Sequence, residues 1–479
     1  MADSALNKPG AKVGRTPNEP IAPNGRPFWN ADVETADAAS LRRREGRLLR
    51  EQLAGAAATS DFYREKWAAA GARPTDVQGV RDLPALPFTE KHELQTALAA
   101  RPPFGTNQAA RSDLLVRMQA TGGTSGIPLR MAMTRADVAT YDEVGARAAW
   151  AAGLRPGDIL FECMNYSLYA GGVNDHGTFE TLGACVAAIG VGQSRRLLEI
   201  LGDLGAPAAL YSTPSYALHL AGVAREAGGD PRALGLRRGL FSGDAGLENP
   251  TYRAEIEDAW GMVARSIYGT SETAPVAAEC DAADGLHWMG QMAFLAEFVD
   301  PDSGAAVALD DGATAELVIT TLRREAHPLI RFRTHDYVRL TVEPCPCGRT
   351  SIRFHVLGRS DDMFIVRGIN VFPLAVAAIV DEFRPVLNGE FRIVLDEPPP
   401  LVAPPRLLVE AAGEVAGNVA GEVAAEQHDA ATASVAAALA ARIRASLMFA
   451  AAVEVVQAGT FPRSEQKTRR VVQPWKGEG

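Results

Sequence analysis

The stretch Ala-Thr-Gly-Gly-Thr-Ser-Gly-Ile-Pro, residues 120–128, follows directly on the apolar run Leu114–Met118. Its three glycines allow the backbone to approach an anion closely, and its hydroxyl side chains add hydrogen-bond donors. We interpret six residues as a candidate phosphate-binding loop: Thr121, Gly122, Gly123, Thr124, Ser125 and Gly126. It is not a Walker sequence, because no Gly-Lys-Ser/Thr closes it, and taken by itself the motif is equally typical of a flexible turn.

Around this loop, short apolar runs alternate with helical patterns. Four runs have the length and composition of buried parallel strands: Leu114–Met118, Ile159–Cys163, Ala208–Tyr211 and Gly239–Ser242. Helical patterns lie between such runs, among them Tyr216–Ala227 and Pro250–Trp260. This alternation predicts a layered α/β fold. Further along, Ala296–Val299 and Glu316–Thr321 flank a turn and predict an antiparallel hairpin.

Composition divides the chain into three parts. Residues 1–30 are rich in Pro, Gly and Asn and predict a flexible tail, whereas residues 31–358 form a large domain that begins with helices over 34–72 and from Thr89. Residues 359–479 are expected to form a small α+β domain. Within it we interpret residues 397–434 as a surface loop or insertion, because they contain Pro-Pro-Pro and repeated Ala-Gly-Glu-Val elements.

The overall composition is that of a globular enzyme, since 47% of the 479 residues are hydrophobic and 22% are charged. A net charge of −10 argues against a nucleic-acid partner, which would require clustered Lys and Arg. No membrane segment or signal peptide is expected; Val435, Leu439, Ile443 and Leu447 recur every four residues, as on one face of a soluble helix. Five cysteines, an odd number, favour a reducing cytoplasm.

Four further motifs carry side chains suited to a nucleotide. Ile267–Glu272 provides an aromatic ring that can stack on a purine and a carboxylate that can bind Mg²⁺. Arg331–Asp336 and Gly358–Asp362 combine Arg with Asp; such pairs are commonly solvated, but a carboxylate also binds a ribose diol and Arg a phosphate. The last motif, Pro462–Lys467, ends in a lysine close to the C-terminus.

Taken together and in this order, the five motifs resemble those of the adenylate-forming (acyl/aryl-AMP ligase) superfamily, and within it the phenylacetate–coenzyme A ligase family. The resemblance extends over nearly the whole chain from about residue 28. It also includes the segments 86–91, 103–105, 213–216, 279–280, 285–287 and 367–373. It implies an α/β fold with a large N-terminal adenylate-forming domain of layered sheets and helices, and a small mobile α+β C-terminal domain.

The resemblance also implies a reaction and a set of residues for it. A carboxylate would attack the α-phosphate of ATP to give acyl-AMP and pyrophosphate, and coenzyme A would then accept the acyl group. Lys467 and Glu272 would be catalytic, Glu272 as the Mg²⁺ ligand, and Asp361 would be the hinge of the small domain. Besides the loop 121–126, the ATP-binding residues would be Gly243, Asp244, Tyr268 (adenine), Gly269, Thr270, Asp336 (ribose) and Arg359.

Two positions depart from the family pattern. Ile127 stands where the family usually has a lysine or another polar residue, so that Arg130 is the candidate to replace it. Gln466 stands where the loop before the catalytic lysine usually has glycine. Because glycine gives a loop conformational freedom, this change bears on domain alternation more than on adenylation.

The segment Leu168–Gly177 resembles the part of the family that binds the aromatic acid. It implies a substrate-binding set of Tyr169, Gly172, Asn174, Asp175 and His176, with Ser212 from a later strand. Asn174 and Asp175 stand where the family has small residues. Because buried polar groups need partners, we expect a hydroxy- or amino-substituted benzoate; in the alternative, both side chains point to solvent.

Cys280, His287, Cys345 and Cys347 could form a structural zinc site of three thiolates and one imidazole. The alternative is a set of buried cysteines without metal. Cys163 and Cys185 are interpreted as core residues.

Three functions stay open at this point. The first is an aryl-acid–coenzyme A ligase with ATP and Mg²⁺, and the second is an aryl-AMP-forming enzyme of natural-product biosynthesis that transfers the acyl group to a carrier protein, an amine or another small nucleophile. The third is an inactive, zinc-stapled binding protein, against which the presence of Glu272, Asp336, Arg359 and Lys467 argues. A monomer and a homodimer are equally compatible with the sequence.

Overall fold

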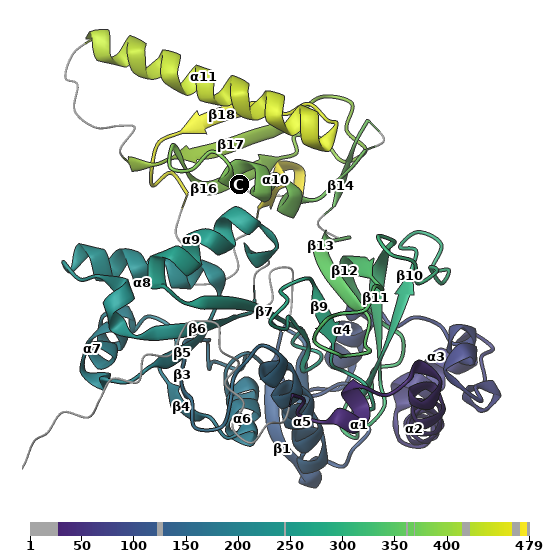
Figure 1. Ribbon diagram of the computed structural model, residues 1–479. Helices are drawn as coiled ribbons and strands as arrows, with labels where there is room; N and C mark the ends of the chain where they lie inside the picture. Colours follow the sequence, from purple (N-terminus) through teal and green to yellow (C-terminus); the bar gives the residue numbers. More distant parts are fainter. Residues whose placement is uncertain are drawn as a thin grey trace, which may run out of the picture.

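Eleven strands form one sheet in the computed structural model, which describes residues 27–121, 128–243, 246–360, 363–367, 369–413, 422–461 and 470–476. The strand order is β10-β11-β12-β13-β9-β8-β7-β6-β5-β3-β4. One half of the sheet is parallel and the other antiparallel, and β7 belongs to both (Figure 1). The α/β fold expected from the sequence is confirmed.

The parallel half contains β4 (Cys185–Ala188), β3 (Ile159–Glu162), β5 (Ala208–Ser212), β6 (Leu236–Phe241) and β7 (Val263–Gly269). The connecting helices are α6 (Val173–Leu182), α7 (Ser194–Leu204), α8 (Pro214–Glu226) and α9 (Pro250–Trp260). Three of the four predicted runs are confirmed here as parallel strands. Leu210 and Leu240, at the centre, are fully buried.

The antiparallel half contains β8 (Pro275–Ala278), β9 (Leu286–Trp288), β13 (Arg353–Arg359), β12 (Phe332–Thr341), β11 (Thr314–Thr321) and β10 (Phe294–Val299). The predicted hairpin is confirmed, because β10 and β11 pair from Phe294 opposite Thr321 to Val299 opposite Glu316. Phe354 and Leu317 lie in the core on this side and are fully buried.

The prediction for Leu114–Met118 was wrong. This run forms β1 (Leu115–Ala120), which pairs antiparallel with β2 (Arg130–Thr134) in a separate two-stranded sheet. Leu114, Val116 and Met118 are about half exposed. Apolar and polar residues alternate from Val116 to Ala120, and the polar side chains of Arg117 and Gln119 face the protein, where they bind Asn174 and the Ser271 carbonyl.

Five α-helices come before β3 in the described part of the chain: α1 (Ala31–Glu34), α2 (Ala38–Thr59), α3 (Asp61–Ala69), α4 (Lys91–Ala100) and α5 (Arg135–Ala151). They confirm the helices predicted over 34–72 and from Thr89. Leu49 and Leu53 of α2 pack with Leu322 and Ile330 of the large domain. The N-cap of α4 is Glu90, whose backbone N–H binds the Glu93 carboxylate 2.7 Å away.

The small domain is built on a four-stranded sheet of order β18-β17-β16-β19. Its elements are β14 (Phe364–Val366), β15 (Ile369–Val371), α10 (Pro373–Asp381), β16 (Leu387–Val394), β17 (Arg406–Ala411), α11 (Glu422–Leu447), β18 (Ala452–Val456) and β19 (Val471–Val472). The predicted apolar helix face is confirmed: Leu439 and Ile443 are fully buried against this sheet.

The interpretation of residues 397–434 as a surface loop was wrong in two places. Residues 406–411 form β17, which pairs with β16 on one side and β18 on the other. From Glu422 onward the segment is the first half of α11. The run Leu407–Val409 is apolar and central, but the Pro-rich segment before it and the Ala-Gly repeats after it hide the strand in the sequence.

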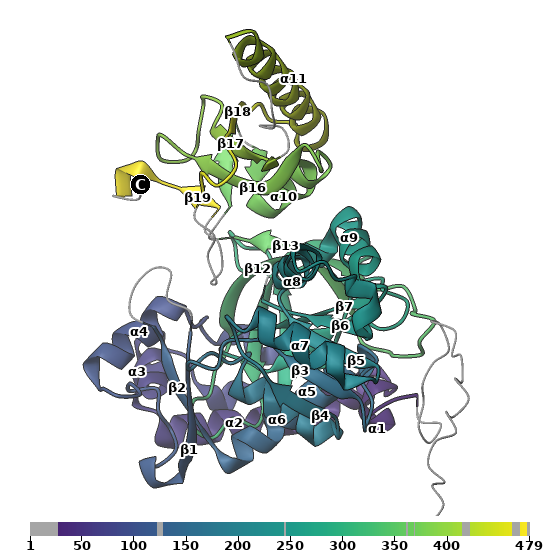
Figure 2. The same cartoon turned by 90° about the vertical axis from the view of Figure 1, so that its left-hand side faces the viewer.

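The small domain lies over the end of the large one that α9 and β13 form (Figures 1 and 2). Asn249 Nδ2 donates to Asp381 Oδ2 at 3.3 Å, and Arg384 contacts Glu255 at 3.6 Å. The rings of Tyr337 and Phe372 stack across the junction with centroids 5.1 Å apart. The expected domain boundary at 358/359 falls within β13. In the described part of the chain, no helix is long and apolar enough to cross a membrane.

Candidate active site

The carboxyl ends of the parallel strands meet at one edge of the sheet. Glu162 ends β3, Ser212 ends β5 and Tyr268–Gly269 end β7, while Gly243 follows β6 closely. In open α/β sheets ligands bind at this edge. The topology therefore brings motifs that are far apart in the sequence to one place.

Tyr268, Asp336 and Arg359 come together at this edge. The Tyr268 hydroxyl donates to Asp336 Oδ2, and Arg359 Nη1 lies 3.4 Å from Asp336 Oδ1. Burial, together with the charge of Asp336, raises the pKa of Tyr268. The Tyr268 ring also packs edge-on against Phe354, with centroids 5.6 Å apart. An aromatic ring, a carboxylate and a guanidinium thus converge from three different strands.

Glu272 lies in the loop after β7 and its side chain is 7% exposed. The ammonium group of Lys91 lies 3.0 Å from its Oε1. The loop itself is held from inside the protein, because Arg324 Nη1 donates to the Glu272 carbonyl at 2.9 Å and Gln119 Nε2 to the Ser271 carbonyl. Glu272 is therefore a buried carboxylate in a fixed loop that already faces one cation.

Other expected nucleotide residues have backbone roles. Thr121 is buried and its hydroxyl accepts from Leu129 N at 3.1 Å. Gly243 has a φ of +89°, which favours glycine. A Cβ on Gly269 would lie 2.7 Å from the Ala274 carbonyl oxygen, so a larger residue does not fit there. Thr270 N donates to Thr273 Oγ1 at 3.2 Å.

Some expected residues lie outside the described part of the chain. These are Gly122, Gly123, Thr124, Ser125, Gly126, Ile127, Asp244, Asp361, Gln466 and Lys467. Arg130, the candidate to replace the lysine missing at Ile127, is described: its Nε donates to the Pro103 carbonyl at 3.2 Å.

The segment of the expected acid site forms the start of α6 with Gly172 as its N-cap. Asn174 and Asp175 are 1% and 4% exposed, so the alternative that both point to solvent is wrong. Asp175 accepts from Tyr141 at 3.0 Å and from Tyr211 at 2.5 Å, and burial raises its pKa to about 7. Their hydrogen bonds thus go to protein groups.

Asn174 has two such partners. Its Oδ1 accepts from Arg117 Nη1 at 2.9 Å, and its Nδ2 donates to Gln119 Oε1. Because Gln119 also holds the Ser271 carbonyl, Asn174 is linked through Gln119 to the Glu272 loop. Tyr169 is half-buried beside this segment, and Ser212 is fully buried with its hydroxyl donating to the Thr213 carbonyl at 2.9 Å.

His176 belongs to a second, partly buried polar group. Its Nδ1 lies 2.9 Å from the Tyr166 hydroxyl and 3.2 Å from Glu162 Oε2, and Tyr166 donates to the same Glu162 oxygen at 2.6 Å. Burial raises the pKa of Glu162 to about 9, and its Oε1 is buried without a hydrogen-bond partner. Glu162 could not be singled out from the sequence, because a lone glutamate at the end of a strand is common.

Cys280, His287, Cys345 and Cys347 converge with their ligand atoms within 4.8 Å of one another. Cys280 Sγ lies 3.6 Å from Cys345 Sγ, and Cys347 Sγ lies 3.4 Å from His287 Nε2. His287 Nδ1 also faces the Ser351 hydroxyl at 3.3 Å, as a metal-ligating imidazole usually faces a polar group. The pKa of Cys347 is lowered mainly by its hydrogen bond to Cys280, and to a smaller extent by its hydrogen bond to His287.

This cysteine group lies away from the candidate active site. β8 runs antiparallel to β7. Cys280, just after the end of β8, therefore lies near the start of β7, whereas Gly269 is at the end of β7. The other two cysteines follow expectation in part. Cys163 is buried, but Cys185 is exposed because β4 is an edge strand, so its assignment to the core was wrong.

Several residues of the site were not found from the sequence. Lys91 and Glu90 were noted within a motif without a role, and Arg324, Gln119 and His335 were not singled out. The signal for Lys91 was weak, since a lysine in the first turn of a helix is normally solvated. What distinguishes it is Glu272, 181 positions further on, which comes close through tertiary structure.

Comparisons with known proteins agree with this geometry. The family described as AMP-binding enzyme C-terminal domain matches residues 368–474. The phenylacetate-coenzyme A ligase of Thermus thermophilus is 36% identical over 358 residues, which cover 74% of this chain and 78% of the relative. The enzyme of the same name from Escherichia coli is 35% identical over 357 residues, with 74% and 78% coverage.

Among solved structures, 2-hydroxyisobutyryl-CoA ligase in the postadenylation state, in complex with R3-HIB-AMP, has a TM-score of 0.84 at 30% identity, covering 96% of this chain and 95% of that one. The same ligase in the thioesterification state, with 2-HIB-AMP and CoA, has a TM-score of 0.69 at 31% identity and the same coverage. The arrangement of the present structure is thus closer to the former state.

Proposed function

The chain belongs to the phenylacetate–coenzyme A ligase family of adenylate-forming enzymes, and we propose that it activates a hydroxy- or amino-substituted benzoate with ATP and transfers the resulting acyl group to the thiol of coenzyme A, releasing AMP. Adenylate formation by an acid–coenzyme A ligase follows from family membership; the aromatic acid and its substituents are our inference. The observation that carries the proposal is the convergence of Tyr268, Asp336 and Arg359 beside the Glu272 loop.

For the nucleotide, we assign Asp336 to the ribose hydroxyls, with Arg359 beside it, and Tyr268 to the adenine. Asp336 is 7% exposed and is oriented by hydrogen bonds on both carboxylate oxygens, which suits a diol that needs a fixed acceptor. Gly243 and Gly269 allow the backbone to come close to the nucleotide. From the family pattern, the loop 121–126 and Asp244 complete this set.

For catalysis, we assign Glu272 as the magnesium ligand and Lys467 as the group between the carboxylate and the α-phosphate. Glu272 fits a cation, because it is a buried carboxylate already paired with the ammonium group of Lys91. Bound Mg²⁺ would supply positive charge where negative charge gathers in phosphoryl transfer. The remaining work falls to the protein: Arg324 and Gln119 hold the loop, so that Glu272 does not need to reorganise.

The preference for a substituted ring is supported by the polar groups at the start of α6. Asn174, Asp175 and His176 are joined to Gln119, Tyr141, Tyr211, Tyr166 and Glu162 by hydrogen bonds. A ring hydroxyl or amine can add a hydrogen bond to such polar groups, whereas a plain ring gains nothing from them. The three side chains belong to separate hydrogen-bonded groups: Asn174 with Gln119, Asp175 with its two tyrosines, and His176 with Tyr166 and Glu162.

We further propose that the cysteine group holds one structural zinc ion. Three thiolates and an imidazole are a donor set for tetrahedral zinc, and their position at the far edge of the sheet separates them from the chemistry. We also propose that residues 359–479 form a domain that rotates about Asp361 between the two half-reactions. The higher TM-score with the postadenylation structure than with the thioesterification structure of one ligase supports two such arrangements.

The proposal is tested by incubating the protein with ATP and a panel of aryl acids, with and without coenzyme A, and identifying the products by mass. We expect aryl-AMP without coenzyme A and aryl-CoA with it. Products formed with an amine or a carrier protein but not with coenzyme A would replace the acceptor and leave adenylation intact. The absence of any acid-dependent AMP formation would overturn the proposal.

Lys467 is tested in the same assay. Lys467→Ala should slow acid-dependent pyrophosphate exchange about 10²–10³-fold, as the loss of one charge-stabilising contact does. Lys476→Ala, a change to the lysine nine residues further on, is the matched control and should keep the wild-type rate. Equal rates for the two variants would contradict the role of Lys467.

A further inference from the structure

The strand that carries Asp336 is interrupted at that point. In the pairing of β11 with β12, Glu316 faces Tyr337 and Val318 faces Arg333, so residues 334–336 stand opposite Leu317. Such a bulge redirects side chains and is common beside active sites. His335, its middle residue, has a φ of +60°, which is uncommon for a residue other than glycine.

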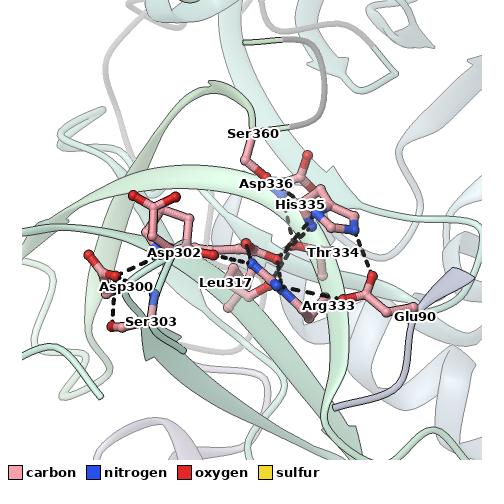
Figure 3. Close-up of polar contacts among 12 residues, drawn as sticks. Glu90, Asp300, Asp302, Ser303, Leu317, Arg333, Thr334, His335, Asp336 and Ser360 are labelled. Carbon is pink, nitrogen blue, oxygen red and sulfur yellow. Dashed lines mark hydrogen bonds and ion pairs between the residues drawn. The ribbon is translucent and has the colours of Figure 1, made fainter. Parts of the chain in front are cut away.

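The ring of His335 is held from two sides (Figure 3). Its Nε2 lies 2.9 Å from Glu90 Oε2, and its Nδ1 lies 3.3 Å from the Ser360 hydroxyl. The backbone is held as well, because His335 N donates to Glu316 Oε1 at 3.2 Å and Ser360 N donates to the His335 carbonyl at 2.6 Å. His335 thus joins α4 to the residue that precedes the expected hinge at Asp361.

Glu90 connects this bulge to the loop that carries Glu272. It is the N-cap of α4, and the next residue, Lys91, is the ion-pair partner of Glu272. Glu90 also faces Arg333 at 3.6 Å, and hydrogen bonding to His335 lowers its pKa. The N-cap and the first residue of α4 therefore contact two parts of the candidate site: Glu90 binds His335, the neighbour of Asp336 in the sequence, and Lys91 binds Glu272.

The bulge sets the direction of Asp336. Thr334, on one side of His335, donates to the Leu317 carbonyl at 2.6 Å and accepts from Asp336 N at 3.0 Å. Asp336, on the other side, meets Tyr268 and Arg359. If the ring of His335 released Glu90, the bulge could relax toward a regular strand. Asp336 would keep its face of the sheet, because burial alternates without a break from Phe332 to Val338, but it would move relative to Tyr268 and Arg359.

We propose that His335 is a positioning residue for ATP: its hydrogen bond to Glu90 holds the bulge 334–336 in the form that presents Asp336 to the ribose. The proposal rests on the proposed function, since it takes Asp336 as the ribose ligand. It predicts an effect on the KM for ATP that is separate from the KM for the acid.

The test compares His335→Asn, Glu90→Ala and the double variant. Asparagine adopts the left-handed conformation most readily among the residues with a side chain, but it is too short to reach Glu90, so this variant removes the ring contact with little added backbone strain. Glu90→Ala removes the same contact from the other side. Thr314→Val is the matched control, because it removes a 2.9 Å contact to Tyr337 of the same strand.

Acid-dependent pyrophosphate exchange gives the KM for ATP, the KM for the acid and kcat. We expect each single variant to raise the KM for ATP about tenfold, with the acid KM unchanged, and the double variant to be no worse than either one. Thr314→Val should match the wild type. An unchanged ATP KM in the single variants, or effects that simply add in the double variant, would overturn the inference.

Two checks keep the result unambiguous. If His335→Asn failed to fold, Glu90→Ala would still decide the question, because it changes the surface of α4 and leaves the strand sequence intact; its ATP KM must rise and its acid KM must not. Wild-type protein without acid-dependent exchange would overturn the proposed function together with this inference. Wild-type exchange with unaffected variants would overturn the inference and leave the function standing.

Discussion

The ammonium nitrogen of Lys91 lies 3.0 Å from Glu272 Oε1. Lys91 is at the start of α4, and Glu272 is in the loop after β7. The Glu272 side chain is 7% exposed and that of Lys91 37%, so the carboxylate is buried and its partner can reach solvent. A buried carboxylate needs a positive partner. Lys91 therefore supplies a positive partner to the carboxylate that we propose as the Mg²⁺ ligand.

It follows that Lys91 and Mg²⁺ compete for Glu272. Lys91→Met should lower the free Mg²⁺ concentration that half-saturates adenylate formation about two- to fivefold, the range expected for loss of a partly exposed ion pair. The measurement is a Mg²⁺ titration of pyrophosphate exchange at saturating ATP and acid. Lys66→Met, which breaks the ion pair to Glu93, is a control outside the site. A higher half-saturating concentration in Lys91→Met would contradict the assignment of Glu272.

The cysteine group should contain one zinc ion per chain. Cys345→Ser should lower the melting temperature by about 5 °C or more, because a bound structural metal contributes to the stability of the fold. The kcat per folded molecule should change little, since the group lies at the edge of the sheet away from Gly269. Cys185→Ser, at an exposed thiol outside the group, is the control. Metal analysis that finds no zinc in protein purified without chelator would rule this out.

The acid site should favour polar rings. Wild-type enzyme should activate a hydroxy- or aminobenzoate in preference to phenylacetate, and Asn174→Gly with Asp175→Ala should narrow or reverse that preference. A site that hydrogen-bonds its substrate discriminates strongly against an analogue that lacks the group. Thr181→Ala, at an exposed position on the same helix, is the control. Equal kcat/KM for phenylacetate and for every substituted acid tested would refute the preference while leaving adenylation untouched.

Asp142 should make stability depend on pH. Its Oδ1 is buried without a hydrogen-bond partner, and burial raises its pKa from 3.8 to about 6. The folded protein therefore binds more protons than the unfolded chain between these values, so the free energy of unfolding falls as pH rises through this window. Asp142→Asn should raise the melting temperature at pH 8 and leave it nearly unchanged at pH 4. A difference between the two proteins that does not vary with pH would contradict this assignment.

Much of the fold could be predicted because its signals are local. Pro250–Trp260 begins with a proline after a capping asparagine and ends at a glycine, and α9 has these same bounds. The runs predicted in β3, β5 and β6 are mainly apolar, as a sheet buried on both faces requires. Leu114–Met118 misled because four of its five residues are apolar, whereas the strand turns its polar side chains inward toward Asn174.

The candidate site was predictable where a motif carries its own chemistry, and not where it depends on contacts between distant segments. Tyr268 and Asp336 could be named from their motifs. The hydrogen bond from Tyr268 to Asp336 could not, because it depends on the order of the strands in the sheet. His335 gave no signal, because its role depends on a bulge and on Glu90, 245 positions earlier. β17 was missed for a similar reason. It lies between β16 and β18 in the sheet, but in the sequence a Pro-rich segment separates it from β16 and the helix α11 separates it from β18.

The junction between the two parts of the chain has a consequence for turnover. In the regions that the structure describes, it consists of the stack of Tyr337 on Phe372 and a few polar contacts, among them Asn249 with Asp381 and Arg384 with Glu255. Contacts of this kind are individually weak, because water can replace them. The interface between the two domains therefore contributes little free energy to holding them in this arrangement. A junction that stores so little free energy does not commit the protein to one domain arrangement. If the small domain rotates as proposed, thermal motion is enough to open the junction, and neither arrangement needs to be forced by the chemistry.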